Sequence, residues 1–431
     1  MNAIRLRPPP RLAAVVRPPG SKSLTNRALA LAAIAEGPSR IEGALDAEDT
    51  RLMVGCLRAL GLEVTHEGDV LELDGAAGPF RFGGEPALDV GTAGTVARFL
   101  TPLLAVSHGR AQLDGSERMR ERPMGMLIEA LRSRGADIEC LGEEGFVPLT
   151  VGRPRNGAKP GLRGGEIRLT RPASSQFISG LVLSALLADS ATEIILEEGT
   201  PARPYVDMTL ATVVAFGGDA RWLDGDTLHV EPGRLHGRTY RVEPDASGAS
   251  YFLGLAAIHG GSIEIPDLGH ASLQGDAGFA RVLERMGAEV EQDATRTRLQ
   301  GRGSLRGGDF DLADMPDMTP TLAVTAAFAG GPSRIRGVAV LRHHESDRIT
   351  ALATELRKLG VRVVEHEDGL DIDPPADGLQ PGVEVDTWRD HRMAMALALV
   401  GDIVVRDPGC VAKTYPHYFD ELAKLGMVAS A

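Results

Sequence analysis

The sequence is short of aromatic residues and cysteines, and the cysteine pattern excludes two kinds of site. Aromatic residues make up 4% of its 431 residues. The three cysteines, Cys56, Cys140 and Cys410, form no CxxC pair and have no Cys/His spacing suited to zinc. We therefore expect neither a disulfide framework nor a metal site. The cysteine usage fits a reducing, cytoplasmic location.

Long hydrophobic runs are absent as well. The most apolar stretch, residues 177–188, holds about 12 residues, whereas a helix that spans a bilayer needs ~20. The apolar residues Leu12 to Val16 are too few for the core of a signal peptide. We expect residues 177–188 to form a buried helix, and we predict no secretion and no membrane partner.

Positive charge is in deficit, which argues against nucleic-acid binding. The chain has 46 Lys and Arg against 59 Asp and Glu, a formal net charge of −13. Proteins that bind nucleic acids neutralise phosphates with an excess of Lys and Arg. No nucleic-acid partner is therefore predicted, and any anionic ligand must be bound by a local cluster of cations.

The sequence does contain a repeat of about 70 residues. In six segments an amphipathic helical pattern is followed by a glycine and then by a short apolar or β-branched run. The glycine stands where a helix ends in a left-handed residue, at Gly61, Gly135, Gly217, Gly287, Gly360 and Gly426. A unit of this length suits a βαβ element with an added hairpin. Generic alternation of helices and strands is the alternative interpretation.

The length implies more than one domain, because a single hydrophobic core stops growing well below 431 residues. Three repeats per domain give an α/β protein with two similar halves. We predict one domain from residues 1–20 and 241–431 and an inserted domain from residues 21–240. The proline-rich segment from Arg17 to Gly20 looks like the crossover that joins the N-terminus to the second half.

Cationic and small polar residues collect at the predicted helix starts. Free backbone N–H groups there attract anions, although a helix cap or a surface ion pair also explains each residue alone. The segments are PGSKSLTNR from Pro19, GTAGT from Gly91, RMRERP from Arg118, Ser174 to Gln176, ESDR from Glu345, Asp390 to Arg392, and KTYP from Lys413. We expect Pro123 to be the first residue of a helix and Arg348 to lie one turn inside the fifth repeat helix.

Two carboxylates stand among these cations. Asp317 precedes an apolar helical run, and Glu345 opens the fifth repeat helix. They are the available proton-transfer groups if the cations face a common ligand. Equally, Asp317 could be an N-cap and Glu345 a first-turn partner of the helix dipole.

The chain resembles the 5-enolpyruvylshikimate-3-phosphate synthase family of enolpyruvyl transferases. The resemblance rests on PGSKSLTNRALALAAIAEG, AGT, RMRERP, SSQF, RPYVDMTL, ESDR, ATELRKLG, DHRMAMA and AKTYP, which follow the family's order and spacing over nearly the whole length. It implies two domains of three βαβαββ units each, an inside-out α/β barrel, with the active site in a cleft between the domains. It also implies aromatic amino-acid biosynthesis, no cofactor, a monomer, and a target of glyphosate.

The resemblance assigns roles to particular residues. Those that would hold shikimate 3-phosphate are Lys22, Ser23, Arg27, Ser174, Ser175, Gln176 and His344. Those that would hold phosphoenolpyruvate are Lys22, Gly94, Arg122, Gln176, Arg348, Arg392 and Lys413. Asp317 would accept the proton of the 5-hydroxyl. Glu345 would protonate C3 of phosphoenolpyruvate, with Lys22 as its assistant or alternative.

Three positions depart from the family's pattern. Ala202, Val340 and His344 stand where the family often has Ser, Asn and Lys. Because the charge of a histidine changes near neutral pH, we predict weaker or more pH-dependent binding of shikimate 3-phosphate.

Two other functions compete with this interpretation. The sister enolpyruvyl transferase acts on UDP-N-acetylglucosamine and usually has a reactive cysteine in a mobile loop, but none of the three cysteines lies near RMRERP. A non-catalytic, anion-binding repeat protein would have no need of Asp317 and Glu345 among cations.

Overall fold

The computed structural model describes residues 3–152 and 161–429, and the chain divides into two compact units. Unit 1 comprises Met1–Pro19 and Glu243–Ala431, and unit 2 comprises Gly20–Val242. The sequence prediction puts these junctions after residues 20 and 240. Each unit has a hydrophobic core of its own.

Both units are built from one repeated pattern of strand, helix, strand, helix and β-hairpin. In unit 2, for example, β6 (Ala87–Asp89) pairs in parallel with β7 (Arg110–Asp114), and β7 pairs antiparallel with β9 (Leu149–Gly152). Strand β8 (Asp137–Cys140) completes the sheet on the far side of β9. Five of the six sheets repeat this order, and the sixth, β1-β23-β22, has three strands, so the predicted α/β fold of βαβαββ-type units is confirmed.

Unit 2 contains three of these sheets, in the orders β14-β3-β5-β4, β6-β7-β9-β8 and β10-β11-β13-β12. The remaining strands are β3 (Pro38–Glu42), β4 (Val64–Glu67), β5 (Val70–Asp74), β10 (Gly165–Thr170), β11 (Thr192–Glu197), β12 (Asp219–Trp222), β13 (Thr227–Glu231) and β14 (Thr239–Arg241). The helices are α1 (Lys22–Ile34), α2 (Glu48–Ala59), α3 (Gly94–Ala105), α4 (Glu117–Arg120), α5 (Gly125–Ser133), α6 (Ser175–Ala185) and α7 (Arg203–Ala215).

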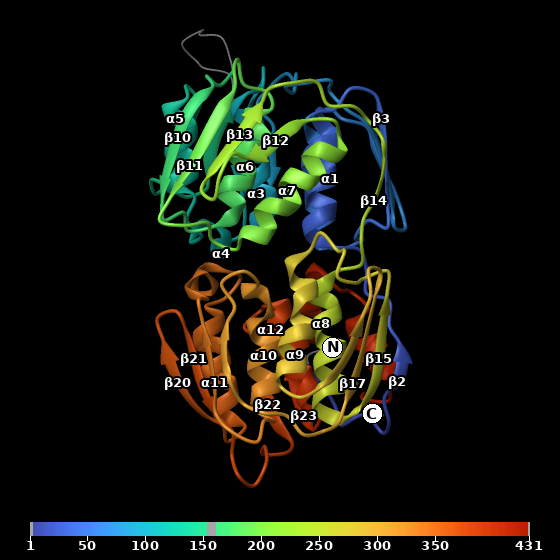
Figure 1. Ribbon diagram of the computed structural model, residues 1–431. Coiled ribbons are helices and arrows are strands. Elements are labelled where there is room, and N and C mark those ends of the chain that lie inside the picture. The colour runs from blue at the N-terminus through green and yellow to red at the C-terminus, as the bar shows by residue number, and fades with distance from the viewer. Residues whose placement is uncertain (1–2, 153–160, 430–431) are drawn as a thin grey trace. The chain divides into compact units, whose positions relative to one another are not determined.

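Three helices form the centre of unit 2. α1, α3 and α6 are apolar on nearly every side and almost wholly buried, as expected of helices surrounded by other elements. α3 packs against both α1 and α6, and the sheets lie outside these helices (Figure 1). The predicted buried helix at residues 177–188 is therefore confirmed, with α6 beginning two residues earlier.

Unit 1 repeats the arrangement with sheets β16-β17-β15-β2, β18-β19-β21-β20 and β1-β23-β22. Its strands are β1 (Ala3–Arg5), β2 (Ala13–Val15), β15 (Gly261–Pro266), β16 (Glu289–Gln292), β17 (Arg296–Gly301), β18 (Asp309–Asp311), β19 (Ser333–Arg336), β20 (Arg362–His366), β21 (Gly369–Asp373), β22 (Val383–Val385) and β23 (Ile403–Arg406). Its α-helices are α8 (Ala246–His259), α9 (Phe279–Arg285), α10 (Thr319–Ala326), α11 (Arg348–Lys358), α12 (His391–Leu397) and α13 (Tyr418–Lys424). Short 3-10 helices cover Gly275–Gly278, Pro316–Met318, Ala339–His343, Ala398–Val400 and Pro408–Lys413.

The N-terminal strands explain why residues 1–19 belong to unit 1. β2 pairs in parallel with β15, and β1 pairs antiparallel with β23. Both partners come from the C-terminal half of the chain, so two of the three sheets of unit 1 are completed by the first 15 residues.

The six repeat glycines follow the second helix of each βαβαββ repeat, three in each of the two units. Each has a positive φ, between 78° and 110°. The residue after each glycine donates its N–H to a carbonyl five residues back, at Leu62, Ala136, Gly218, Ala288, Val361 and Met427. This is the Schellman motif, which satisfies the last carbonyls of a helix and favours glycine.

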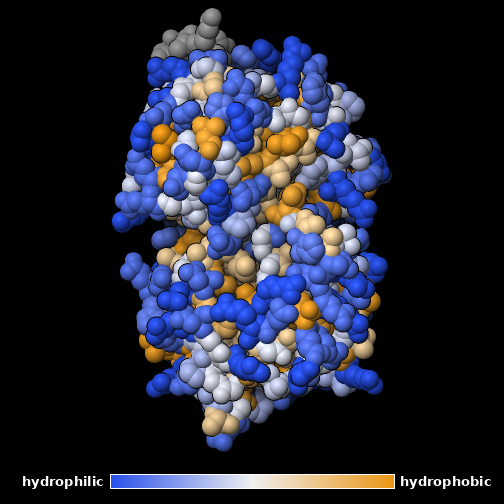
Figure 2. Space-filling model, in the orientation of Figure 1, coloured by the Kyte–Doolittle hydropathy of each residue, from blue (hydrophilic) through white to orange (hydrophobic). Residues whose placement is uncertain are grey.

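The visible surface is mainly hydrophilic, with small scattered hydrophobic patches (Figure 2). In the part of the chain that the structure describes, the exposed large hydrophobic side chains are Val15, Leu141, Val214, Leu223, Leu273, Val364 and Trp388. Among the described residues, the helices are too short or too polar to cross a bilayer.

Candidate active site

In unit 2, Arg27 of α1 joins the N-terminal halves of α1, α6 and α7. Its Nε donates to Thr209 Oγ1 at 2.8 Å, and its Nη1 donates to the carbonyl of Ser23 at 2.9 Å. Its Nη2 donates to the carbonyl of Tyr205 at 2.7 Å and to Ser179 Oγ at 3.4 Å. Burial lowers the pKa of Arg27 to about 10, still far above neutrality, so Arg27 remains charged. It therefore places a buried cation where α1, α6 and α7 meet.

Arg98 of α3 contacts the first turn of α6 and the segment before α5. Its Nη1 donates to Gln176 Oε1 at 2.8 Å, and its Nη2 donates to the carbonyl of Pro123 at 3.2 Å. Its guanidinium also lies over the ring of Phe177, 5.0 Å from the centroid. Because the oxygen of Gln176 faces Arg98, the amide nitrogen of Gln176 must point the other way.

Arg122 and Gly94 are packed closely at the start of α3. Arg122 is 3% exposed, and its Nη1 donates to the carbonyl of Thr92 at 3.0 Å. A Cβ added to Gly94 would lie 2.7–2.9 Å from three atoms of the Arg122 guanidinium. A side chain at position 94 would therefore displace Arg122.

Lys22 is the first residue of α1 and forms an ion pair with Asp49 of α2, at 3.2 Å. Ser21 caps α1 and Ser174 caps α6, so the helix-cap explanation holds for Ser174. Ser23 and Ser175 lie in the first turns of these two helices. All the predicted residues of unit 2 thus lie where the N-terminal ends of α1, α3 and α6 gather.

Arg348 is the centre of a second group, in unit 1. Its side chain is 1% exposed, and each of its five N–H donors has an acceptor. Two bonds go to Asp390 (2.8 and 3.2 Å), and single bonds of 2.9 Å go to Asp317, His344 Nδ1 and Glu345. Burial opposes the charge, but the carboxylates of Asp390, Glu345 and Asp317 outweigh it and raise the pKa of Arg348.

Asp317 is held by two guanidinium groups. Besides Arg348, Arg392 donates from Nη2 to Asp317 Oδ2 at 2.7 Å. The other arm of Arg392 donates to the hydroxyl of Tyr251 at 3.5 Å. Burial raises the pKa of Tyr251 to about 12, so the hydroxyl stays protonated at neutral pH. Asp317 keeps 18% of its side chain exposed and can still meet a ligand.

Glu345 is also held by two cations. Arg348 donates to one oxygen at 2.9 Å, and Lys413 Nζ lies 3.7 Å from the other. His344 accepts from Arg348 through Nδ1, which means that its ring is neutral in this arrangement. The six residues predicted here, Asp317, His344, Glu345, Arg348, Arg392 and Lys413, thus form one cluster of alternating charges.

The structure corrects two helix boundaries. Arg348 is the first residue of α11 and does not lie one turn inside it, because Asp347 caps the helix by accepting from the N–H of Thr350 at 3.1 Å. Pro123 is not the first residue of a helix. The next residue, Met124, donates its N–H to the carbonyl of Gly145, and α5 begins only at Gly125.

Sequence reasoning missed the buried counter-ions of the cluster residues. Asp390 is fully buried and accepts from Arg348, from Ser346 Oγ and from the N–H of Arg392. Asp49 pairs with Lys22 and is 2% exposed. In sequence both look like ordinary carboxylates at a helix start, and only the proximity of Asp390 to Arg392 hints at more.

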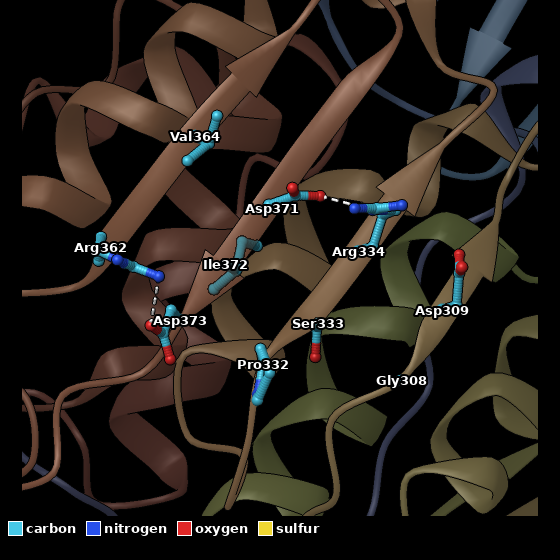
Figure 3. Close-up of a pocket in the computed structure, with 10 residues that line it drawn as sticks. All are labelled: Gly308, Asp309, Pro332, Ser333, Arg334, Arg362, Val364, Asp371, Ile372 and Asp373. Carbon is cyan, nitrogen blue, oxygen red and sulfur yellow. Dashed lines mark hydrogen bonds and ion pairs between the residues drawn. The ribbon is translucent and has the colours of Figure 1, made fainter.

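The hollow drawn in Figure 3 lies elsewhere, on the outer face of the β18-β19-β21-β20 sheet. It has a volume of about 330 Å³. Four of its charged residues pair with one another, Arg334 with Asp371 at 2.9 Å and Arg362 with Asp373 at 3.1 Å, and Asp309 pairs with Arg336 at 2.7 Å. It contains none of the predicted site residues. Over the described part of the chain, His, Cys, Asp and Glu side chains form no group suited to a metal ion.

The chain is similar to known proteins over nearly its whole length. The family described as EPSP synthase (3-phosphoshikimate 1-carboxyvinyltransferase) matches residues 6–422. A 3-phosphoshikimate 1-carboxyvinyltransferase of Erwinia tasmaniensis is 41% identical over 436 residues, which cover 99% of this chain and 100% of that protein. Another, from Yersinia pestis, is 40% identical over 437 residues, covering 100% of both chains.

Solved structures share the fold. EPSP synthase from Acinetobacter baumannii superposes with a TM-score of 0.80 at 26% identity, covering 99% of this chain and 98% of that chain. The enolpyruvyl transferase NikO from Streptomyces tendae has a TM-score of 0.79 at 20% identity, covering 99% and 97%, and is a likeness of fold.

Proposed function

The chain belongs to the EPSP synthase family, and on this premise we propose how its residues transfer an enolpyruvyl group from phosphoenolpyruvate to the 5-hydroxyl of shikimate 3-phosphate. The protein is an enzyme, and enolpyruvyl transfer between these two substrates is its reaction, a step of the shikimate pathway. The observation that carries the assignment of roles is the pair of carboxylates, Asp317 and Glu345, each held by two cations.

Shikimate 3-phosphate is assigned to the helix starts of unit 2, with His344 from unit 1. Ser23, Ser174, Ser175 and Gln176 offer hydroxyl and amide groups, and Lys22 offers a charge. Four of the five N–H donors of Arg27 already bind protein acceptors, so Arg27 acts mainly as a nearby buried charge. The N-terminal ends of helices and nearby cations favour the binding of a phosphate group.

Phosphoenolpyruvate is assigned to Lys22, Gly94, Arg122, Gln176, Arg348, Arg392 and Lys413. Since every donor of Arg348 is occupied, an anionic substrate that binds it must replace a protein acceptor. Asp390 is fully buried, whereas Glu345, Asp317 and His344 keep 10%, 18% and 18% of their side chains exposed. We therefore expect one of these three to give way. If it is Glu345 or Asp317, its carboxylate becomes available for proton transfer.

The proposed reaction has two steps. Asp317 accepts the proton of the 5-hydroxyl while the oxygen attacks C2 of phosphoenolpyruvate, and Glu345 protonates C3 to form a methyl group. The resulting ketal then loses its phosphate, and a base removes one C3 proton to restore the double bond. Cations that surround the phosphate stabilise the negative charge as it leaves. Lys22 assists Glu345 or takes its place as the acid.

An isotope experiment tests this addition and elimination. In D₂O the methyl group of the intermediate carries one deuteron, so deuterium should appear at C3 of the enolpyruvyl product. A product without deuterium would contradict the two-step reaction. Glu345→Gln should slow the incorporation if Glu345 is the acid, whereas Glu421→Gln, at a partly buried position of α13 that pairs with Lys424, should not.

Two of the three cysteines, Cys56 and Cys410, do not support the alternative acceptor, UDP-N-acetylglucosamine. Burial raises the pKa of Cys56 and of Cys410 to about 12, so neither thiol is ionised at neutral pH. Only a thiolate is an effective nucleophile.

Three finer properties are part of the proposal. We expect a cytoplasmic monomer, in keeping with its cysteine usage and mainly hydrophilic visible surface (Figure 2). We also expect inhibition by glyphosate at micromolar concentration, because Gly94 has no side chain that would displace Arg122 from the proposed phosphoenolpyruvate site. An enzyme insensitive to micromolar glyphosate would contradict that expectation.

A further inference from the structure

The segment that leads into α12 contains an unfavourable backbone conformation. Trp388 and Arg389 have φ values of 55° and 54°, two consecutive non-glycine residues in the left-handed region. Residues with a side chain avoid this region, so contacts elsewhere must hold the turn. Trp388 is also one of the few large hydrophobic residues exposed on the surface, at 38%.

The turn sets the position of Asp390. The N–H of Asp390 donates to the carbonyl of Thr387 at 2.8 Å, across the two left-handed residues. Asp390 in turn accepts two bonds from Arg348 and one from the N–H of Arg392. A shift of the turn would therefore move Asp390, the acceptor that orients Arg348. It would also move the first turn of α12, which Asp390 caps.

A buried carboxylate holds the turn from the other side. Glu355 Oε1 accepts from Trp388 Nε1 at 2.9 Å, and Glu355 Oε2 accepts from the N–H of Asp386 at 2.9 Å. Lys358 adds an ion pair at 2.7 Å. The Glu355 side chain is 1% exposed, and a buried carboxylate is costly unless its oxygens are bonded in this way.

Glu355 and Arg348 belong to the same helix. They are seven residues apart on α11, about two turns, so they lie on one face of it. Arg348 binds the segment at Asp390, and Glu355 binds it at Asp386 and Trp388. One helix face thus fixes both ends of the segment.

We propose that Glu355 is a positioning residue of the active site, which acts through the Trp388 turn and Asp390 to fix Arg348 and Arg392. This role rests on the proposed function in one respect, since it assumes that Arg348 and Arg392 bind phosphoenolpyruvate. Both oxygens of Glu355 must be acceptors, because both partners in the segment are N–H donors. An amide at this position can accept at one oxygen only and places an NH₂ group against the other donor.

The kinetic test uses Glu355→Gln, Trp388→Phe and the control Lys358→Met. The control removes the ion pair within α11 and leaves both contacts with the segment. Glu355→Gln and Trp388→Phe should raise KM for phosphoenolpyruvate about tenfold, as expected for a lost hydrogen bond to a charged group. KM for shikimate 3-phosphate should change less than about twofold, and Lys358→Met should resemble the wild type.

The proposal would be overturned if KM for phosphoenolpyruvate stayed within about twofold of wild type in both variants, or if both KM values rose together as general loosening would produce. Trp388→Phe removes one contact of Glu355 and keeps those with Asp386 and Lys358, so it should lower the melting temperature less than Glu355→Gln does. A folding defect in Glu355→Gln would therefore not end the test. A wild-type enzyme without turnover would contradict the proposed function instead.

A spectroscopic measurement tests the contact without relying on turnover. The chain has two tryptophans, Trp222 and Trp388, so Trp222→Phe leaves Trp388 as the sole emitter. In that background, Glu355→Gln should shift the emission of Trp388 to longer wavelength and make it easier to quench with acrylamide. Unchanged emission and quenching would mean that Glu355 does not hold the turn, and the proposal would fail.

Discussion

Single residues decide the chemistry of the cluster in unit 1, and Asp317 is the most directly testable of them. Asp317→Asn keeps the shape and an acceptor oxygen for one arginine but cannot take up a proton at neutral pH. We expect kcat to fall by about 10²- to 10⁴-fold, the usual contribution of a general base, with a much smaller change in either KM. Steady-state kinetics with both substrates measure this.

The control for Asp317 lies three residues away. Asp314 is exposed on the surface, so Asp314→Asn should leave kcat near wild type. If Asp317→Asn lost kcat and substrate binding in equal measure, the residue would be a structural ion pair and its role as a base would be wrong.

His344 predicts a pH dependence. Its ring is neutral while it accepts from Arg348, and protonation would add a positive charge that favours a phosphate. KM for shikimate 3-phosphate should therefore rise as the pH increases from about 6 to 8, where histidines usually titrate. His344→Lys, which carries its charge throughout, should flatten the profile. A flat wild-type profile would refute the role of His344.

Sequence alone located most of the cations of the cluster but not the buried carboxylate that orients them. The positions of Arg348, Arg392, Lys413 and Asp317 follow from helix starts and family motifs, and the structure brings them together. Asp390 could not be found in this way, because a carboxylate at a helix start looks like a cap. Its burial follows from long-range packing, which local patterns do not record.

At the level of elements, α2 offers a matched pair of glycine substitutions, one at the repeat glycine after the helix and one inside the helix. Gly61 follows α2 with a φ of 94°, and Gly55 lies within α2, while a Cβ at either position would meet no atom within 4 Å. Gly61→Ala should destabilise the protein by about 1–2 kcal/mol through its backbone alone. Gly55→Ala should stabilise it by roughly 0.5–1 kcal/mol.

Urea unfolding followed by circular dichroism checks this pair. Opposite signs are the expected result, because the two positions differ in backbone conformation and not in packing. Equal effects would mean that the left-handed end of the helix is not what selects glycine there.

The predicted helix ends were more reliable than the helix starts. In each of the six repeats the glycine after the amphipathic run marks a Schellman motif, and all six glycines were located from sequence. Starts depend on which residue caps the helix. At ESDR the cap is Asp347 and not a residue before Glu345, so the pattern placed α11 too early.

For the whole molecule, the two units should differ in their ability to fold alone. Unit 2 is continuous, from Gly20 to Val242, and contains all the strands of its three sheets. Residues 20–242 should therefore unfold cooperatively when expressed alone. Residues 243–431 lack β1 and β2, which leaves edges of β23 and β15 unpaired, and should be unstable without the N-terminal segment.

Adding residues 1–19 back through a linker should restore a cooperative transition to unit 1. If residues 243–431 unfolded as cooperatively without them, the N-terminal strands would not be integral to the fold. The sequence indicated this arrangement only through a proline-rich crossover, since strand pairing over more than 200 residues leaves no local pattern.

The measurement that tests the central claim most directly is phosphate release from phosphoenolpyruvate by the wild-type enzyme with each of two acceptors. Shikimate 3-phosphate should support release, and UDP-N-acetylglucosamine should not. No release with shikimate 3-phosphate, or equal release with the nucleotide sugar, would contradict the assignment.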